Sequence, residues 1–212
     1  MSAAQTQRIP NNVDIEGDLI VRGNLPNIPR SSLVQDDFVS FMIPLERFRV
    51  WDAYATALPG TSATDDLGMI TGTFGTAPPY IGTGDVKNTT VTRYARVGYQ
   101  LPAEYVAGQS VRLTLHAGMI TTVSSGAATV DVECYKMAQD GSTGMGSDLV
   151  TTAATTIRSL TFGDKDFDIT STALSPGDWL DIRITVNIVD SATGTAVIGA
   201  ILAAEMKLDI KG

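Results

Sequence analysis

The side chains in this sequence that could do chemistry are few, and they do not form a catalytic pattern. A Ser-His-Asp or Cys-His nucleophile system needs a histidine, and the sequence contains one, His116. Alternation places His116 on the polar face of its strand, and no Gly-x-Ser-x-Gly elbow is present. A zinc site needs about four ligands, and the one cysteine, Cys134, falls on the opposite, apolar strand face. The sequence therefore predicts a protein that is not an enzyme, with no catalytic residues, no metal and no cofactor.

Three aspartates spaced two residues apart are a second candidate site. Asp164, Asp166 and Asp168 would lie on one face of a strand, where their hard carboxylate oxygens would suit Ca²⁺. Lys165 lies among them, and the segment lacks the glycine-containing loop pattern of a calcium site. These two features favour a solvated strand face over a calcium site.

Aromatic side chains are a third candidate, because a set of exposed rings can stack on sugars. At 7% of the residues, with two tryptophans, the aromatic content is low for a carbohydrate-binding protein. Packing in the core explains these rings about as well. The candidates for such a stacking surface are Trp51, Tyr54, Tyr80, Tyr94, Tyr99 and Tyr105.

Composition and charge narrow the class of protein. A length of 212 residues suits one large domain, or one domain with an arm, and needs no disulfide or metal to hold a core. The net charge of −8 argues against a nucleic-acid binder, which normally shows a basic patch. Residues 1–8 lack the apolar core of a secretory signal, and no apolar run approaches the roughly 20 residues of a membrane helix. We therefore expect synthesis in a cytoplasm, with neither nucleic acid nor membrane as a partner.

The strongest structural signal is a β-hairpin over residues 180–210. From Leu180 to Ile188 every even-numbered residue is apolar and the residues between are polar, which is typical of a strand with one buried face. Turn-forming residues at 190–194 follow, and a second run then alternates in the same way. Its apolar residues are Ile198, Ala200, Leu202, Ala204, Met206, Leu208 and Ile210.

The middle of the chain predicts further strands in a regular series. The runs at residues 157–162 and 166–170 would form a hairpin about residues 163–165. With the C-terminal hairpin, about eight strands follow the N-terminal segment. The fold class is therefore all-β, and the expected architecture is a β-sandwich in the form of a jelly roll. The alternating runs in the middle of the chain are 90–101, 111–116, 130–135, 157–162 and 166–170.

The first 30 residues differ from the rest and are predicted to form an extended N-terminal arm. Residues 13–23 alternate like a short strand, and Pro26 and Pro29 then stiffen a linker that cannot sit inside a sheet. We assign residues 1–30 to the arm and its proline-containing linker, and residues 31–212 to the β-sandwich domain. Two interpretations of the arm stay open: docking on a neighbouring subunit, and folding back as an edge strand of its own domain.

Four segments resemble parts of tailed-phage virion proteins. Residues 14–23, DIEGDLIVRG, are similar to the GnLtVxG segments near the start of many such proteins. Residues 101–108, 148–153 and 174–181 are similar to stretches in structural proteins of aquatic tailed phages. The similarity covers most of the chain, and its motifs are turn-and-strand patterns without catalytic residues. The chain thus resembles the jelly-roll capsid decoration, or cement, proteins of tailed bacteriophages.

This resemblance implies a virion structural protein on the outside of a phage head, assembled in the host cytoplasm. It implies a homotrimer that binds the major capsid protein and stabilises the capsid. A strand of the arm that adds to a neighbour's open sheet edge would supply main-chain hydrogen bonds for this contact. The arm residues expected to bind the partner are Ile15, Leu19, Val21, Leu25 and Ile28.

An alternative from another class stays open. A tail or head-fibre protein, or a glycan-binding module, that recognises a host-surface carbohydrate would also be a β-sandwich. Such a protein would show aromatic and acidic side chains clustered in a groove. A host glycan is therefore a second candidate partner, and an enzyme is the least expected class.

Overall fold

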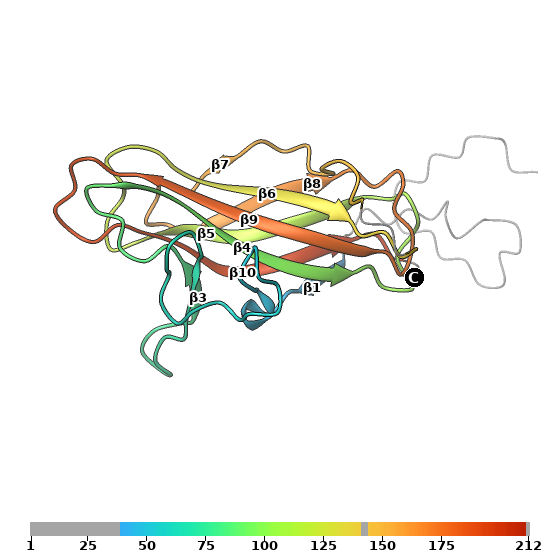
Figure 1. Ribbon diagram of the computed structural model, residues 1–212, viewed down its shortest axis with the longest axis horizontal. Coiled ribbons are helices and arrows are strands. Elements are labelled where there is room, and N and C mark those ends of the chain that lie inside the picture. The colour runs from blue at the N-terminus through green and yellow to red at the C-terminus, as the bar shows by residue number, and fades with distance from the viewer. Residues whose placement is uncertain (1–38, 141–143, 211–212) are drawn as a thin grey trace, which may run out of the picture. The chain divides into compact units, whose positions relative to one another are not determined.

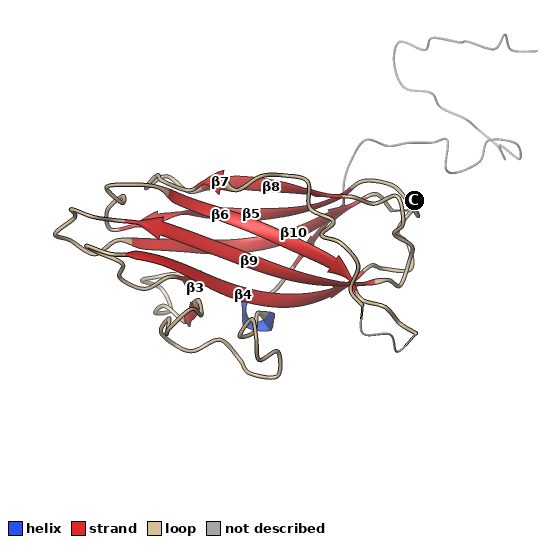
Figure 2. Ribbon diagram, turned by 45° about the horizontal axis from the view of Figure 1, so that its top comes forward, coloured by secondary structure: helices blue, strands red, loops and turns tan. Residues whose placement is uncertain are grey.

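The computed structural model describes residues 39–140 and 144–210, and they fold into two antiparallel sheets that pack face to face (Figures 1 and 2). One turn of 3-10 helix, η2 (Leu45–Arg47), follows the first strand. No helix in the described ranges has the length and apolar character that crossing a bilayer requires. The strands are β1 (Val39–Met42), β2 (Gly68–Ile70), β3 (Tyr80–Gly82), β4 (Thr90–Gln100), β5 (Val111–Ile120), β6 (Ala128–Lys136), β7 (Thr155–Thr156), β8 (Gly163–Ile169), β9 (Trp179–Val189) and β10 (Ile198–Leu208).

The eight strands from β3 to β10 have the topology of a jelly roll. Their order is β3-β10-β5-β8 in one sheet and β4-β9-β6-β7 in the other, so the chain crosses between sheets at every connection except β6 to β7. Strand β2 extends the first sheet beside β3, and β1 pairs with the C-terminal half of β10. The predicted all-β sandwich, a jelly roll of about eight strands, is confirmed.

Strand β9 shows how the sequence pattern builds the core. It lies between β4 and β6, and its even-numbered residues from Leu180 to Ile188 are almost fully buried. Burying one such side chain stabilises the fold by about 1.5–3 kcal/mol. Cys134 of β6 is buried on the same side, as its alternation predicts, and burial raises the pKa of its thiol to about 12. The odd-numbered residues of β9 therefore lie on the outer face of the four-stranded sheet.

The structure corrects the alternation predicted at Leu202. The register between β10 and β5 shifts between Ile201 and Ala203, so Leu202 is the extra residue of a β-bulge. As a result Ile201 is buried and Leu202 only half-buried. After the bulge the predicted alternation resumes, with Ala204 and Met206 in the core.

The predicted hairpin about residues 163–165 is wrong. Strand β8 begins at Gly163 and pairs with β5 of the six-stranded sheet, whereas the preceding β7 pairs with β6 of the other sheet. Cross-strand contacts favour strand over turn in this segment: His116 Nδ1 of β5 lies 2.7 Å from Asp164 Oδ1 of β8. The chain thus changes sheets where the sequence pattern indicated a tight return.

Candidate functional site

The outer face of the four-stranded sheet carries the candidate site. Alternation along β4, β9 and β6 points one set of side chains into the core and the other set to this face. Strand pairing aligns the outer residues in rows, because residues at the same register in adjacent strands lie about 5 Å apart. Charged, polar and aromatic groups therefore lie side by side across three strands. Two of these rows are Arg96–Arg183–Glu133 and Gly98–Asp181–Tyr135.

Trp51 reaches this face from a segment that extends the edge of β4. Arg49 and Arg96 exchange two backbone hydrogen bonds, with N to O distances of 2.8 and 3.0 Å. Two residues further on, the ring centroid of Trp51 lies 5.1 Å from that of Tyr94, with an interplanar angle of 49°. The indole Nε1 donates a hydrogen bond of 3.0 Å to Asp65 Oδ2. Main-chain pairing and this hydrogen bond together fix the indole beside the sheet.

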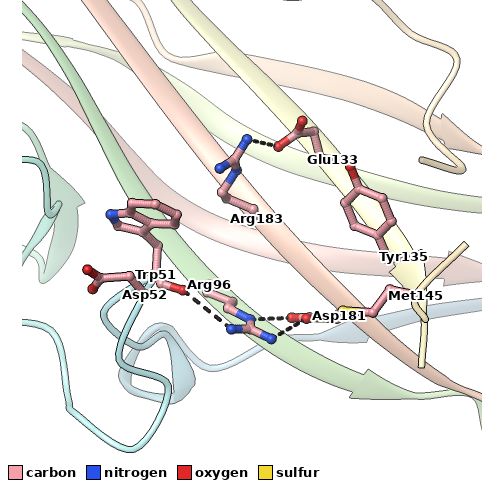
Figure 3. A pocket seen from close by; sticks show the side chains of 8 residues that line it. All are labelled: Trp51, Asp52, Arg96, Glu133, Tyr135, Met145, Asp181 and Arg183. Atoms are coloured by element: carbon pink, nitrogen blue, oxygen red, sulfur yellow. Dashed lines mark hydrogen bonds and ion pairs between the residues drawn. The ribbon is translucent and has the colours of Figure 1, made fainter. Parts of the chain in front are cut away.

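A cavity of about 300 Å³ lies on this face (Figure 3). Its volume is at the lower end of the range for small-molecule sites. In Figure 3, Arg96 and Arg183 extend from neighbouring strands, and each points to a different carboxylate. The residues that line the cavity are Trp51, Asp52, Arg96, Glu133, Tyr135, Met145, Asp181 and Arg183.

The Arg96–Asp181 pair is the most buried ion pair of the site. Arg96 donates from Nε to Asp181 Oδ1 at 2.6 Å and from Nη2 to Oδ2, so the contact is bidentate. The Asp181 side chain is 8% exposed. The hydrogen bonds to Asp181 raise the pKa of Arg96 above its ordinary value. Arg96 is therefore held as a cation whose charge is neutralised within the site.

Arg183 is held between an anion and two rings. It forms an ion pair with Glu133, and its guanidinium carbon lies 5.0 Å from the ring centroid of Tyr94 and 5.5 Å from that of Trp51. Such cation–π contacts stabilise by about 0.5–2 kcal/mol. Its Nε is buried and has no hydrogen-bond partner among the described residues. The guanidinium is thus positioned by stacking as much as by charge.

Gly98 makes room for a further ring. A Cβ at Gly98 would lie 2.5 Å from the Tyr54 hydroxyl oxygen, so Tyr54 can lie over β4 only because residue 98 has no side chain. The Tyr54 ring centroid lies 5.0 Å from the guanidinium carbon of Arg96, and the tyrosine is 45% exposed. Tyr54 therefore extends the aromatic surface beyond the cavity.

The structure brings together three of the six aromatic residues considered from the sequence: Trp51, Tyr54 and Tyr94. The other three lie elsewhere. Tyr80 is on β3 of the other sheet. Tyr99 packs against the core, where burial raises its pKa to about 12, and Tyr105 is fully buried.

Sequence reasoning missed the charged pairs and Tyr135. The alternation with buried Cys134 and Ile182 places Glu133, Tyr135 and Arg183 on outer faces. It does not show that β4, β9 and β6 are neighbours, and only that order aligns their outer residues. The signal that could have pointed to these residues is the recurrence of polar residues between apolar ones in three separate runs.

His116 and the three aspartates lie on the outer face of the other sheet. The predicted solvent-facing position of His116 is confirmed, because its side chain is 39% exposed. Asp166 and Asp168 accept hydrogen bonds of 2.7 Å from Thr114 and Arg112. Arg112 also lies 3.4 Å from Asp166 Oδ2, so it bridges the two aspartates. The described residues contain no group of three His, Cys, Asp or Glu side chains arranged to hold a metal.

The predicted arm and the domain boundary at residue 30 lie outside the described residues. The same holds for the residues expected to bind a partner, which are Ile15, Leu19, Val21, Leu25 and Ile28. These assignments stay predictions.

Comparison with known proteins shows similarity of fold only. No protein-family model matches the chain, and no curated protein matches it by sequence. A xylan-binding domain from Paenibacillus barcinonensis is 14% identical over 80% of this chain and 99% of that domain, with a TM-score of 0.45. The xylan-binding module CBM15 is 9% identical over 82% and 99%, with a TM-score of 0.42. A chain of infectious bursal disease virus, Gx strain, is 13% identical over 63% of this chain and 32% of its own length, with a TM-score of 0.30. Similarity at this level carries no argument about function, which therefore rests on the geometry of the site.

Proposed function

We propose that this chain is a non-enzymatic carbohydrate-binding protein, with its ligand on the outer face of the four-stranded sheet. The observation that supports the proposal is the content of one cavity. Trp51 and Tyr135 enter it from separate segments, next to two guanidinium–carboxylate pairs. A sugar ring has an apolar face that can stack on an aromatic ring and hydroxyl groups that pair with planar polar groups. The cavity offers both kinds of contact.

The polar groups of the cavity are preorganised. Arg96 and Asp181 fix each other through two hydrogen bonds, and Arg183 is held by Glu133 and two rings. Carboxylate oxygens have more lone pairs than these contacts use, so they can also accept hydrogen bonds from sugar hydroxyls. Groups that are already in place lose little conformational entropy when a ligand binds. This arrangement favours binding of a hydroxyl-rich ligand.

The same pairing argues against hydrolysis of the ligand. A glycosidase uses two carboxyl groups at the scissile bond, one of which must donate a proton. Here Glu133 and Asp181, two of the three carboxylates that line the cavity, each lie against a guanidinium group. Both are placed to accept hydrogen bonds, and neither is placed as a general acid.

The test is a glycan array probed with the full chain, followed by calorimetry on the strongest ligand. Trp51→Ala removes the main stacking ring, and we expect it to lower affinity at least about tenfold, since about 1.4 kcal/mol corresponds to a factor of ten. Phe74→Ala is the matched control, because Phe74 is fully exposed and does not line the cavity. An array without binding, or equal affinity in the Trp51 variant, contradicts the proposal.

A place on a phage virion stays a separate proposal, which is supported by the sequence resemblance alone. A glycan-binding fibre or decoration protein on the virion surface would combine that resemblance with the cavity. Light scattering would test the predicted homotrimer, whose mass is three times 22.4 kDa. Cosedimentation with purified capsids would test binding to the major capsid protein. A monomer that does not bind capsids contradicts the virion assignment and leaves the glycan proposal standing.

A further inference from the structure

A further large aromatic side chain, Trp179, lies on the same face outside the cavity. Trp179 is the first residue of β9 and is 41% exposed. It has the same parity along the strand as Asp181 and Arg183, so its side chain belongs to the outer face. At a rise of about 3.3 Å per residue, it lies about 7 Å along the strand from Asp181 and about 13 Å from Arg183. The aromatic surface therefore continues along β9 beyond the cavity.

The backbone around Trp179 is firmly held. Met137 N donates a hydrogen bond of 2.9 Å to Trp179 O, and the turn before it is closed by Ser175 N donating to Asp178 Oδ2 at 2.8 Å. Lys136 Nζ lies 2.7 Å from the same carboxylate oxygen of Asp178. A half-exposed tryptophan on such a fixed backbone is poorly explained by core packing. It is well placed to stack on a ligand at low conformational cost.

Charge restricts the kind of ligand. The cavity is lined by two arginines and three carboxylates, and each arginine lies against a carboxylate. The lining residues therefore sum to a charge of −1, from two positive and three negative groups. Near Trp179, Lys136 is likewise paired with Asp178. An anionic sugar would meet paired cations and a net negative site, and its own charge would be desolvated without a partner.

We infer that the site binds a linear, uncharged oligosaccharide that runs along β9, with one part over the Trp51 cavity and another stacked on Trp179. This inference rests on the proposed carbohydrate-binding function and adds the length and charge of the ligand. A short sugar fills the cavity alone, whereas a longer chain also reaches Trp179. Affinity should therefore rise with chain length, and Trp179 should be the cause of the rise.

The experiment compares chain lengths and charges with the full-length protein. The probes are cello-, xylo-, manno- and malto-oligosaccharides of two and six units, with oligogalacturonides of the same lengths as anionic probes. We expect a neutral series to bind best, with the six-unit sugar at least about tenfold tighter than the two-unit sugar. In Trp179→Ala this difference should disappear while affinity for the two-unit sugar changes less than about twofold. Trp179→Phe keeps a ring at this position and should keep most of the difference.

The outcomes separate the two proposals. Stronger binding of the oligogalacturonides, or a length preference that survives in Trp179→Ala, overturns this inference and leaves carbohydrate binding intact. Absence of binding to every probe and to the glycan array overturns both. Because Trp179 is half-exposed, its variants should unfold at the wild-type urea concentration, and this measurement shows whether a lost affinity comes from the site.

Discussion

The outer faces of the two sheets both carry pairs of basic and acidic side chains, but the pairs differ in their exposure to solvent. On the six-stranded sheet, Arg112 and His116 of β5 pair with aspartates of β8, and these partners are solvent-exposed. On the four-stranded sheet, Arg96 and Arg183 pair with carboxylates that are 8% and 30% exposed. The second face also has aromatic rings above its ion pairs and a cavity among them. The first face is typical of a solvated sheet, and the second carries the candidate site.

The difference between the two faces comes from the segments that pair with the edge of the four-stranded sheet. The edge of β4 is covered by the segment after η2 and by residues 65–67, which hydrogen-bond to it at Arg96 and Tyr94. This cover brings Trp51 and Tyr54 over ion pairs that would otherwise be exposed to water. Charged ladders on a sheet are common and contribute little by themselves. Here the rings of Trp51 and Tyr54 reduce the solvent exposure of the ion pairs. The ion pairs and the rings together form the candidate site.

The largest expected effect distinguishes the ion pairs of the two faces. Asp181→Asn leaves Arg96 without its bidentate partner in a nearly buried setting, and we expect the free energy of unfolding to fall by about 2 kcal/mol. Asp168→Asn removes the same chemistry from an exposed pair with Arg112, and the expected loss is about 0.5 kcal/mol or less. Urea unfolding of both variants and the wild type measures the two values.

A double variant serves as the control for this comparison. Replacing both partners, with Arg96→Met and Asp181→Leu, removes the unpaired charge and should recover part of the stability lost in Asp181→Asn. Equal losses in Asp181→Asn and Asp168→Asn would mean that the two faces do not differ in the way their charges are buried.

Much of the fold could be predicted from the sequence, because buried strands leave a local signature. The alternation from Leu180 to Ile188 predicts β9 and its buried face, and the number of such runs predicts a jelly roll of about eight strands. The bulge at Leu202 and the change of sheet before Gly163 have no local signature, since each depends on the partner strand.

The candidate site was harder to predict for the same reason. Its groups come from β4, β9, β6 and the segment of Trp51, and they meet only through strand order and edge pairing. Aromatic content gave Trp51, Tyr54 and Tyr94 as candidates but gave no reason to prefer them to Tyr99 or Tyr105. Non-local register therefore decides which polar residues of a β-sandwich become neighbours.

A smaller effect is expected from two glycines, one on each sheet. Gly98→Ala puts a methyl group against the Tyr54 hydroxyl, and since Tyr54 is half-exposed it should move away from the face. We expect glycan affinity to fall about threefold, or about 0.7 kcal/mol, with little change in stability. Gly163→Ala of β8 meets no atom within 4 Å and should stabilise by about 0.5 kcal/mol without changing affinity. Calorimetry and urea unfolding check both, and unchanged affinity in Gly98→Ala would remove Tyr54 from the site.

The last expected effect is a change of stability with pH, and it concerns Asp190, in the loop between β9 and β10. Asp190 is 1% exposed, and it accepts hydrogen bonds from Asn88 N and Ser125 N, both at 2.8 Å, and from the Thr193 hydroxyl. These donors come from the β3–β4, β5–β6 and β9–β10 loops. The carboxylate therefore links three loops that each connect one sheet to the other. Burial alone would raise the pKa of Asp190, but the hydrogen bonds from Thr193, Ser125 and Asn88 outweigh it and hold the pKa well below its usual range.

The sign of the pH dependence follows from this lowered pKa. The unfolded chain binds a proton at Asp190 near pH 4 while the folded chain still does not, so the stability from this carboxylate is complete above about pH 5 and is lost as the pH falls further. Asp190→Asn removes the titrating group, so the stability difference between wild type and variant should be constant from pH 7 to 5 and shrink by pH 3. Urea unfolding at these three pH values measures it. A stability difference that is the same at all three pH values would contradict this prediction. It would show that the charge of Asp190 does not stabilise the three loops that its carboxylate joins.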